Sequence, residues 1–536
     1  MCRPKLYRNQ SKKSPAVNLN LNDKPSSPEN LISRKQRFYV IAAALLTLFL
    51  GALDALVMSA AMPTIVTDLG GLHLYSWVYS AYLLARAVSL PVFGKLADIF
   101  RSRRLYVISI CIFLLGSVLA GLAQSMTQLI LSRVLQGIGA GGNFALVYIV
   151  LTDISAPGNR AKTLSLASFI WGLASVLGPT FGGFVVTYFS WRWIFFVNVP
   201  LGLFSLLGIV LYVIEVRPKK KDASIDYLGV LTLSTAILGL LTVFLLAGRD
   251  YAWISPQIIG IWLITIGSAI AFYYAEKRAR EPILSLSFFG NRGFSVGNAA
   301  AFLASFTIFS LFAYSPLFIQ GALGKTPLQM SVAMLSLSLG WSIGALVCGQ
   351  IVNRLGQKAA TILGSLFLAV GGGIMLTFST ATSLTACSVV LGFAGVGMGF
   401  VSMATLLVVQ DSLDISDLGV ATASHQFSRT LGGTIGVGVS GSFVTLSLSN
   451  ALESLMNTGL SSLPPSLKVQ IEQNIENIFR PEVQMLLTPD VQQAMKAAVA
   501  RGVSIVFWIS LLASMACLIF SAILPAQPAS KEKKHI

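Results

Sequence analysis

Four charged side chains stand inside stretches of sequence that are otherwise apolar. They are Asp54, Arg86, Arg133 and Arg429, and each lies in a different apolar run. In a lipid bilayer such groups are costly unless they pair or face a water-filled cavity, and they commonly mark ion or substrate pathways. Loss of solvation raises the pKa of a buried carboxylate toward a range in which it exchanges protons. Asp54 is therefore the first candidate for proton chemistry.

Two interpretations of Asp54 stay open from the sequence. It could couple proton movement or recognise a cationic substrate, or it could form a structural ion pair with Arg86 or Arg133. The two interpretations are compatible, because an ion pair that breaks and reforms can couple a proton to a conformational change. For Arg133 the alternatives are a place in the proton pathway and structural hydrogen bonding. Arg86 lies eight residues before Gly94, on the same helical face.

The composition explains why these charges are unusual. Of the 536 residues, 54% are hydrophobic and 11% are charged, whereas soluble proteins carry roughly 25% charged residues. The chain is therefore predicted to be an all-α membrane protein that spans the bilayer many times. Runs of about 20 apolar residues occur fourteen times, at about 38–60, 76–97, 105–124, 128–151, 163–189, 194–215, 226–247, 256–275, 294–320, 328–352, 359–379, 384–409, 418–446 and 502–524.

The basic residues predict the orientation of these spans. Of the 38 Lys and Arg residues, 28 lie in alternate connections or in the two tails. Because positive charge is retained on the cytoplasmic side, both termini are expected in the cytoplasm. The net charge of +17 is thus explained by membrane orientation, and no nucleic-acid partner is expected. The expected location is the cell membrane, plasma or inner.

The spans group as six, two and six. We expect a disordered cytoplasmic tail (1–37), a six-helix bundle (38–215), and linkers with two inserted helices (216–293). Then follows a second six-helix bundle (294–524), which contains an outer loop (447–501). The chain ends in a short cytoplasmic tail (525–536). Two related bundles are typical of secondary transporters.

A short polar turn separates the second and third spans. Its sequence, Gly94-Lys95-Leu96-Ala97-Asp98 followed by Ile99 to Arg104, packs four basic residues and an aspartate into a link with no room for a domain. We expect Gly94, Asp98, Arg103 and Arg104 to form a gate that latches the cytoplasmic side. A weaker echo of this turn, Gly349–Lys358, lies at the matching place in the second bundle.

Glycine-rich stretches have a structural interpretation here. Gly178, Pro179, Gly182 and Gly183 in the fifth span supply a proline kink and a small-residue face, which favours a hinge or gate. The stretch from Gly137 to Gly142 fits G-x-G-x-x-G, but no strand precedes it, so its glycines are expected to let helices approach closely. The sequence indicates no ATP site, cofactor, metal site or disulfide framework, and no enzyme activity.

A substrate cavity is the remaining candidate site. Aromatic and polar side chains in the fourth, fifth and ninth spans could line it, although helix packing is the other explanation for such aromatics. These residues are Asn143, Trp171, Phe312, Tyr314 and Gln320.

Several of these motifs, taken in order, resemble the fourteen-helix drug:proton antiporters of the major facilitator superfamily. The resemblance covers Phe38 to about Leu524. It rests on Asp54–Pro63, Trp77–Leu84, Gly94–Arg104, Arg133-x-x-Gln136-Gly137, Gly178-Pro179-x-x-Gly182-Gly183, Trp191–Pro200 and Arg429-x-Leu431-Gly432-Gly433. The chain departs from the family at Ile99, Arg101 and Ser102 of the turn, where Arg101 replaces a glycine. It also departs at Arg86, where an apolar residue is usual.

The resemblance implies a proton-coupled exporter of small amphipathic organic compounds that works by alternating access. Its partners would be a small-molecule substrate, protons and the lipid bilayer, and it would act as a monomer. A dedicated exporter of a metabolite or siderophore, and an uncoupled facilitator, are alternatives on the same fold. A non-transporting receptor or scaffold is the alternative of another class, and Asp54, Arg86 and Arg133 argue against it.

Overall fold

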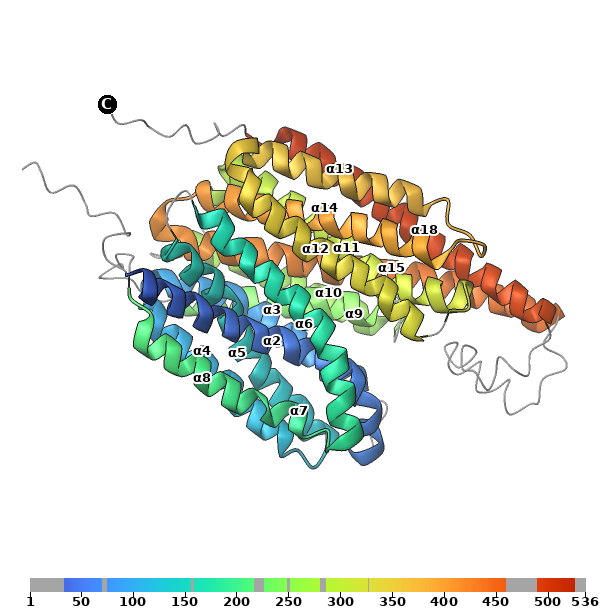
Figure 1. Cartoon of the computed structure of the whole chain (residues 1–536), viewed down its shortest axis with the longest axis horizontal. Coiled ribbons are helices and arrows are strands. Elements are labelled where there is room, and N and C mark those ends of the chain that lie inside the picture. Colours follow the sequence, from blue (N-terminus) through green and yellow to red (C-terminus); the bar gives the residue numbers. More distant parts are fainter. Residues whose placement is uncertain are drawn as a thin grey trace, which may run out of the picture.

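The protein is a bundle of long helices that run alongside one another (Figure 1). The computed structural model describes residues 33–69, 75–155, 159–215, 226–247, 251–279, 286–325, 327–458 and 489–525. The first half contains α2 (Arg34–Leu69), α3 (Tyr75–Ile99), α4 (Ser102–Gly121), α5 (Met126–Asp153), α6 (Arg160–Tyr188), α7 (Trp193–Phe196) and α8 (Asn198–Tyr212). After the inserted pair α9 (Tyr227–Leu246) and α10 (Pro256–Arg278), the second half contains α11 (Arg292–Leu317), α12 (Pro327–Leu355), α13 (Gln357–Met375), α14 (Leu384–Asp411), α15 (Leu418–Thr458) and α18 (Pro489–Ile523).

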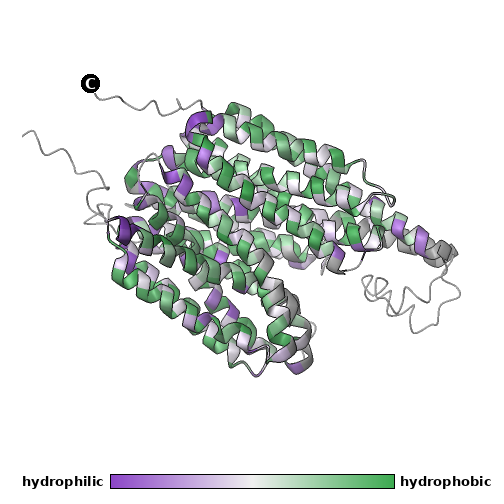
Figure 2. Ribbon diagram, in the orientation of Figure 1, coloured by the Kyte–Doolittle hydropathy of each residue, from purple (hydrophilic) through white to green (hydrophobic). Residues whose placement is uncertain are grey.

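The helices have the length and composition needed to cross a bilayer. Within the described residues, eleven segments are long and apolar enough to do so, and α7 with α8 counts as one of them. The long helices α3, α6 and α15 complete the fourteen that the sequence predicts. Figure 2 shows hydrophobic residues along the bundle. A helix satisfies its own backbone hydrogen bonds, which is why apolar runs of this length fold as helices in lipid.

Some helices extend beyond the apolar runs that predicted them. The outer loop expected at 447–501 is shorter, because α15 continues to Thr458 and α18 begins at Pro489. The segment added to α18 is rich in Ala, with Gln and Met, which favour helix in water as well as in lipid. Within that loop the sequence also predicts an amphipathic helix at 468–480, because apolar residues recur there at near-helical spacing. This stretch lies outside the described residues.

The turn between α3 and α4 is tight even though Arg101 stands where the family has glycine. Only Phe100 and Arg101 separate the two helices, and Arg101 adopts an extended conformation with φ −63° and ψ 120°. Any L-residue reaches that region, so no glycine is needed. At the matching link between α12 and α13, the single connecting residue Gly356 has φ +85°, a conformation that does favour glycine.

The two halves share one hydrophobic core at a single end of the molecule. We call this end, where α2 begins and α18 ends, the base. The base core combines first-half residues such as Val40 and Leu146 with second-half residues such as Phe400 and Leu407. A second core lies wholly within the second half, and a third, around Met62 and Phe195 at the opposite end, lies wholly within the first half. The base core is therefore the hydrophobic core that the two described halves share, whereas the second and third cores each belong to one half.

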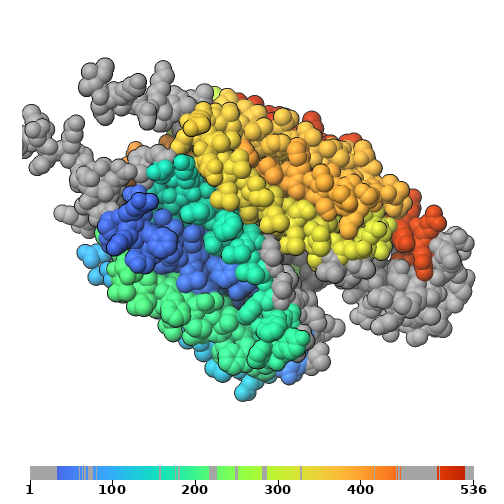
Figure 3. All heavy atoms as spheres, viewed as in Figure 1, coloured from blue at the N-terminus to red at the C-terminus, as the bar shows by residue number. Residues whose placement is uncertain are grey.

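The inserted helices attach to the junction between the halves. On α9, Ile237 and Leu241 pack with Leu84 and Ala87 of α3, and Phe427 of α15 contacts the same cluster. The outer helix α10 packs on α9 and is mostly exposed. Figure 3 shows a further junction, in which α6 lies against α12. There Ser342 donates a hydrogen bond of 2.9 Å to the carbonyl of Ser168.

The glycines of α5 confirm the packing role expected for the G-x-G-x-x-G stretch. A Cβ at Gly137 would meet the backbone of Tyr82 on α3, 2.5 Å away. A Cβ at Gly139 would lie 2.7 Å from both the Cα of Phe113 and the carbonyl oxygen of Ser109 on α4. Contacts this close to backbone leave no room for a side chain. The stretch therefore lets α5 approach both neighbouring helices.

We expect Gly139→Ala to destabilise the first half by about 1–3 kcal/mol, because the added methyl group must displace the α4 backbone. The measurement is the thermal unfolding midpoint of the purified protein in detergent. Gly373→Ala is the matched control, because a Cβ at Gly373 has no neighbour within 4 Å. Equal midpoints for the two variants would contradict the proposed role of Gly139.

Candidate functional site

A buried ion pair lies at the centre of the first half. Arg133 on α5 donates through its NH1 atom to Oδ2 of Asp54 on α2, over 2.6 Å. Both residues are only 1% exposed. The sequence left Arg86 and Arg133 as alternative partners of Asp54, and the structure pairs it with Arg133.

Two amides complete the surroundings of the carboxylate. The side chain of Gln136 on α5 donates to Oδ1 of Asp54 over 2.8 Å, and Asn198 on α8 donates to the same oxygen over 3.0 Å. Both amides also donate to the hydroxyl of Ser117 on α4. Gln136 and Asn198 belong to the sequence motifs but are not among the predicted site residues. The signal that could have found them is a polar side chain in an apolar helix, which in lipid needs a partner.

Aromatic rings cover the arginine of this pair. The guanidinium carbon of Arg133 lies 4.0 Å from the ring centroid of Tyr82 and 6.0 Å from that of Phe195. Rings at these distances attract the cation and exclude water. Removing one partner of a buried pair typically costs about 3–5 kcal/mol. Protonation of Asp54 would therefore favour a rearrangement around Arg133.

Arg86 lies apart from the hydrogen-bonded group of Asp54. Its guanidinium carbon is 4.3 Å from the ring centroid of Phe144 and 5.6 Å from that of Trp171. Arg86 is half-buried. The structure thus separates the two arginines, placing Arg133 with the carboxylate and Arg86 among aromatic rings.

At the base, Asp98 joins the two halves. Its carboxylate, near the end of α3, accepts hydrogen bonds from the backbone N–H groups of Gly419 (2.8 Å) and Val420 (2.9 Å) at the start of α15. An anion at this position satisfies free N–H groups and complements the helix dipole. Gly94 makes the approach close, since a Cβ there would collide with the Cβ of Ala423 and lie 3.0 Å from the carbonyl oxygen of Gly419.

The two arginines of the expected gate are exposed, whereas Asp98 is buried against the second half. Arg103 and Arg104 are exposed at the start of α4. The backbone N–H of Arg103 donates to Glu215 over 2.9 Å, a contact within the first half. Gly94 and Asp98 thus contact the second half, whereas this contact of Arg103 stays within the first half.

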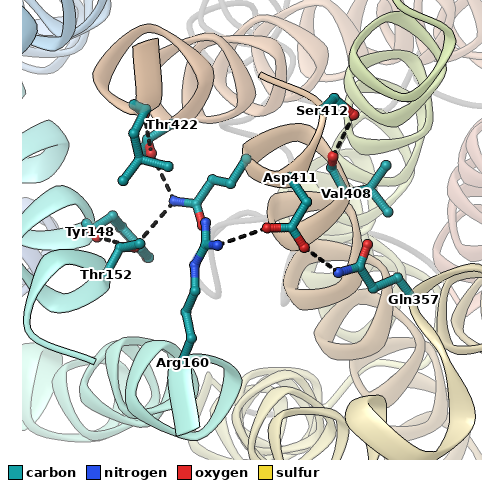
Figure 4. Close-up of polar contacts among 10 residues, drawn as sticks. Tyr148, Thr152, Arg160, Gln357, Val408, Asp411, Ser412 and Thr422 are labelled. Atoms are coloured by element: carbon teal, nitrogen blue, oxygen red, sulfur yellow. Dashed lines mark hydrogen bonds and ion pairs between the residues drawn. The ribbon is translucent and has the colours of Figure 1, made fainter. Parts of the chain in front are cut away.

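A second link between halves, at Asp411, was not among the sequence-predicted sites (Figure 4). Arg160 at the start of α6 binds Asp411 at the end of α14 over 2.7 Å and also donates to the side chain of Gln410. Gln357 of α13 donates to the second carboxylate oxygen of Asp411 over 2.6 Å. Burial lowers the pKa of Arg160, and the nearby Asp411 opposes this effect. Two interpretations of Asp411 follow from the sequence, a solvated loop, which was favoured, and pairing with a basic turn of the other half. The structure shows the pairing, with Arg160.

The expected hinge lies in a continuous helix, because α6 runs without interruption from Arg160 to Tyr188 and includes Pro179. Gly178 packs against α2, where an added Cβ would lie 2.8 Å from the Cβ of Leu56. Gly182 is buried, and Gly183 has open space beside it. These contacts place the stretch next to the helix that carries Asp54.

The five expected cavity residues do not form one group of contacts. Trp171 lies beside Arg86, whereas Asn143 is buried and accepts a hydrogen bond of 2.7 Å from Ser109 on α4. On α11, the Tyr314 hydroxyl donates to the carbonyl of Val437 over 3.0 Å, and the ring of Phe312 lies 6.4 Å from that of Phe309. Gln320 is exposed in the π-helical turn that follows α11, Phe318–Ala322.

An ion pair also fastens the first half at the end opposite the base. Asp68 accepts hydrogen bonds from the side chains of Trp191 and Arg192, each over 2.9 Å. These two bonds hold the pKa of Asp68 below its usual value. The contact is therefore present at neutral pH and is lost only as the pH falls through that lowered pKa.

We expect Asp98→Ala to favour opening of the base by about 1–2 kcal/mol, because two N–H groups of α15 lose their acceptor. That corresponds to a population shift of roughly 5- to 30-fold. Spin labels at Phe100 and Leu355, which are 43% and 42% exposed and lie in opposite halves, would report a longer distance. The control is Asp414→Asn, an exposed carboxylate on the connection before α15. An unchanged distance distribution in Asp98→Ala would refute the role of this contact.

Comparison with known proteins places these features in a family. A sequence model of the Major Facilitator Superfamily matches residues 44–437. The chain is 32% identical over 494 residues to the multidrug transporter protein MdtP of Bacillus subtilis, covering 92% of this chain and 91% of that protein. It is 29% identical to multidrug resistance protein 3 of the same organism, covering 88% and 92%. It is 30% identical to the efflux pump FUS6 of Gibberella moniliformis, covering 82% and 80%.

Solved structures agree at the level of the fold. The human organic anion transporter MFSD10 superposes with a TM-score of 0.59 at 14% identity, covering 89% of this chain and 99% of that one. The proton:xylose symporter XylE superposes with a TM-score of 0.58 at 16% identity, covering 92% and 96%. On the length of the sequence match and the shared helical architecture, this chain belongs to the Major Facilitator Superfamily of membrane transporters.

Proposed function

We propose that this protein exports small amphipathic organic compounds in exchange for protons. The observation that carries the proposal is the buried pair of Asp54 and Arg133, because a transporter without ion coupling gains nothing from two charges removed from water. Relatives named as multidrug transporters and an efflux pump support the direction of transport and the class of substrate.

The proposed mechanism is alternating access, in which the halves rock around a site between them. In the present conformation the base is closed by Asp98, Arg160 and Asp411. If the base faces the cytoplasm, as the distribution of basic residues predicts, this is an outward-facing state of a multi-pass protein of the cell membrane. Because both halves belong to one chain, we propose that a monomer is sufficient.

In this mechanism Asp54 carries the proton. The ionised carboxylate is held by Arg133, Gln136 and Asn198. Neutralising it by protonation weakens the attraction to Arg133, which is then free to rearrange. A movement of Arg133 toward or away from Asp54 would then let the carboxylate take up the proton on one side and release it on the other. We propose that this movement of Arg133 then changes the contact of Asp98 with α15 and the packing of Gly178 against α2.

We expect substrate to dissipate an imposed pH gradient in inverted membrane vesicles that contain the protein. Ethidium, a planar cation, and 1-naphthalenesulfonate, a planar anion, serve as the two test compounds. In Asp54→Asn the proton flux should fall at least tenfold, because the amide cannot carry a proton. Asp68→Asn is the matched control, since it removes a carboxylate from the same helix at its far end, outside the buried group.

Two results would refute the proposal. Transport of either compound without any proton flux would identify an uncoupled facilitator. Undiminished proton flux in Asp54→Asn would remove Asp54 from the coupling mechanism.

A further inference from the structure

A second pair of arginines lies between the two halves, outside the Asp54 group. Arg86 belongs to α3 in the first half, and Arg429 belongs to α15 in the second half. The guanidinium carbon of Arg86 lies 4.3 Å from the ring centroid of Phe144, and the ring of Phe144 lies 5.4 Å from that of Tyr148. The charge of Arg429 acts on the phenol of Tyr148 as well. Both arginines are half-buried.

Aromatic rings surround both cations. Arg86 lies over Phe144 and Trp171, as described above. The guanidinium carbon of Arg429 lies 5.2 Å from the ring centroid of Trp341 on α12. The rings of Phe144 and Tyr148 are 5.4 Å apart and connect the two arginines. Phe144 and Trp171 are partly exposed and pack on the base core, so this group, which we call the arginine–aromatic site, lies directly above the closed base.

The site has an excess of hydrogen-bond donors over acceptors. Arg429 donates to Oε1 of Gln426 over 3.0 Å, and the phenol of Tyr148 lies beside both side chains. The Nε atom of Arg429 and the Nε2 atom of Gln426 are buried and make no hydrogen bond of good geometry. Among the described residues, no carboxylate forms an ion pair with Arg86 or Arg429. Asp54 is not available to them, because its oxygens are occupied by Arg133, Gln136 and Asn198.

This arrangement has a clear chemical preference. Two cations held close together in a medium of low dielectric repel each other, and an anion between them removes the repulsion. A guanidinium that lies over an aromatic ring keeps N–H donors in its own plane, where they match the two oxygens of a carboxylate or sulfonate. The surrounding rings provide a surface for a planar apolar body.

We propose that the arginine–aromatic site binds organic anions in which a carboxylate or sulfonate is attached to an aromatic or other planar apolar body. The acidic group contacts Arg86 and Arg429, one from each half, and the planar body lies among Phe144, Trp171 and Trp341. The inference rests on the proposed transport function and names its substrate class. Since the arginines belong to different halves, the anion also bridges them.

The test compares two probes of similar shape and opposite charge on the purified full-length protein. They are 1-naphthalenesulfonate and trimethyl-1-naphthylammonium, with binding measured by equilibrium dialysis in lipid nanodiscs. We expect the sulfonate to bind at least tenfold more tightly. Arg86→Leu and Arg429→Leu should each weaken sulfonate binding at least tenfold, whereas the Lys variants, which keep the charge, should weaken it only a few-fold.

Controls separate loss of binding from loss of structure. Arg354→Leu removes an exposed arginine at the base and should leave sulfonate binding unchanged. The unfolding midpoint of each variant without probe shows whether it is folded. The comparison of the two probes on the unmodified protein requires no substitution and remains decisive if a Leu variant fails to fold.

The proposal is overturned if the ammonium compound binds as tightly as the sulfonate, or if folded Leu variants bind the sulfonate normally. Failure of the anion-site proposal can be distinguished from failure of the proposed proton-coupled export. If ethidium dissipates the pH gradient in a manner that depends on Asp54, but the sulfonate does not bind, proton-coupled export is supported and the anion-binding site is refuted.

Discussion

The ion pair between Asp54 and Arg133 is the interaction on which the organisation of the first half depends. Two charges that are 1% exposed are tolerated only because Gln136 and Asn198 bind the carboxylate and Tyr82 covers the guanidinium. These residues come from α2, α3, α5 and α8, so satisfying one carboxylate requires four helices to converge. A change in the charge of Asp54 would consequently alter the packing of all four helices.

The two halves depend on each other through a small number of polar contacts at the base. Asp98 binds the start of α15, and Arg160 binds the end of α14, over contacts of 2.7 to 2.9 Å. The Arg160–Asp411 contact is partly exposed, so water can replace it and breaking it costs less than breaking the Asp54–Arg133 pair. The contact of Asp98 is buried, but its partners are two backbone N–H groups and not a second buried charge. This difference suits a conformational switch, because the halves stay internally rigid while their junction opens. The arginine–aromatic site lies at that junction, between the two kinds of contact.

Much of the fold could be predicted from local features of the sequence. Apolar runs of about 20 residues predict membrane helices because the bilayer leaves the backbone no other way to satisfy its hydrogen bonds. The helix ends at Thr458 and Pro489 were harder, because helix formation continues past the membrane boundary wherever the residues favour it. The tight turn at Arg101 formed without glycine, since the required backbone conformation is open to any residue.

By itself the sequence determined which residues carry charge into the membrane, because each of them interrupts an apolar run: Asp54, Arg86, Arg133 and Arg429. It did not determine their partners, since pairing depends on which helix faces lie together, and residues 79 positions apart in the chain meet only in three dimensions. The tertiary structure alone decided that Arg133 forms the ion pair with Asp54. It also decided that Arg86 lies against aromatic rings, near the second half that carries Arg429. The physical reason is that a buried charge is stabilised by the neighbours that packing provides, and packing is a property of the whole bundle.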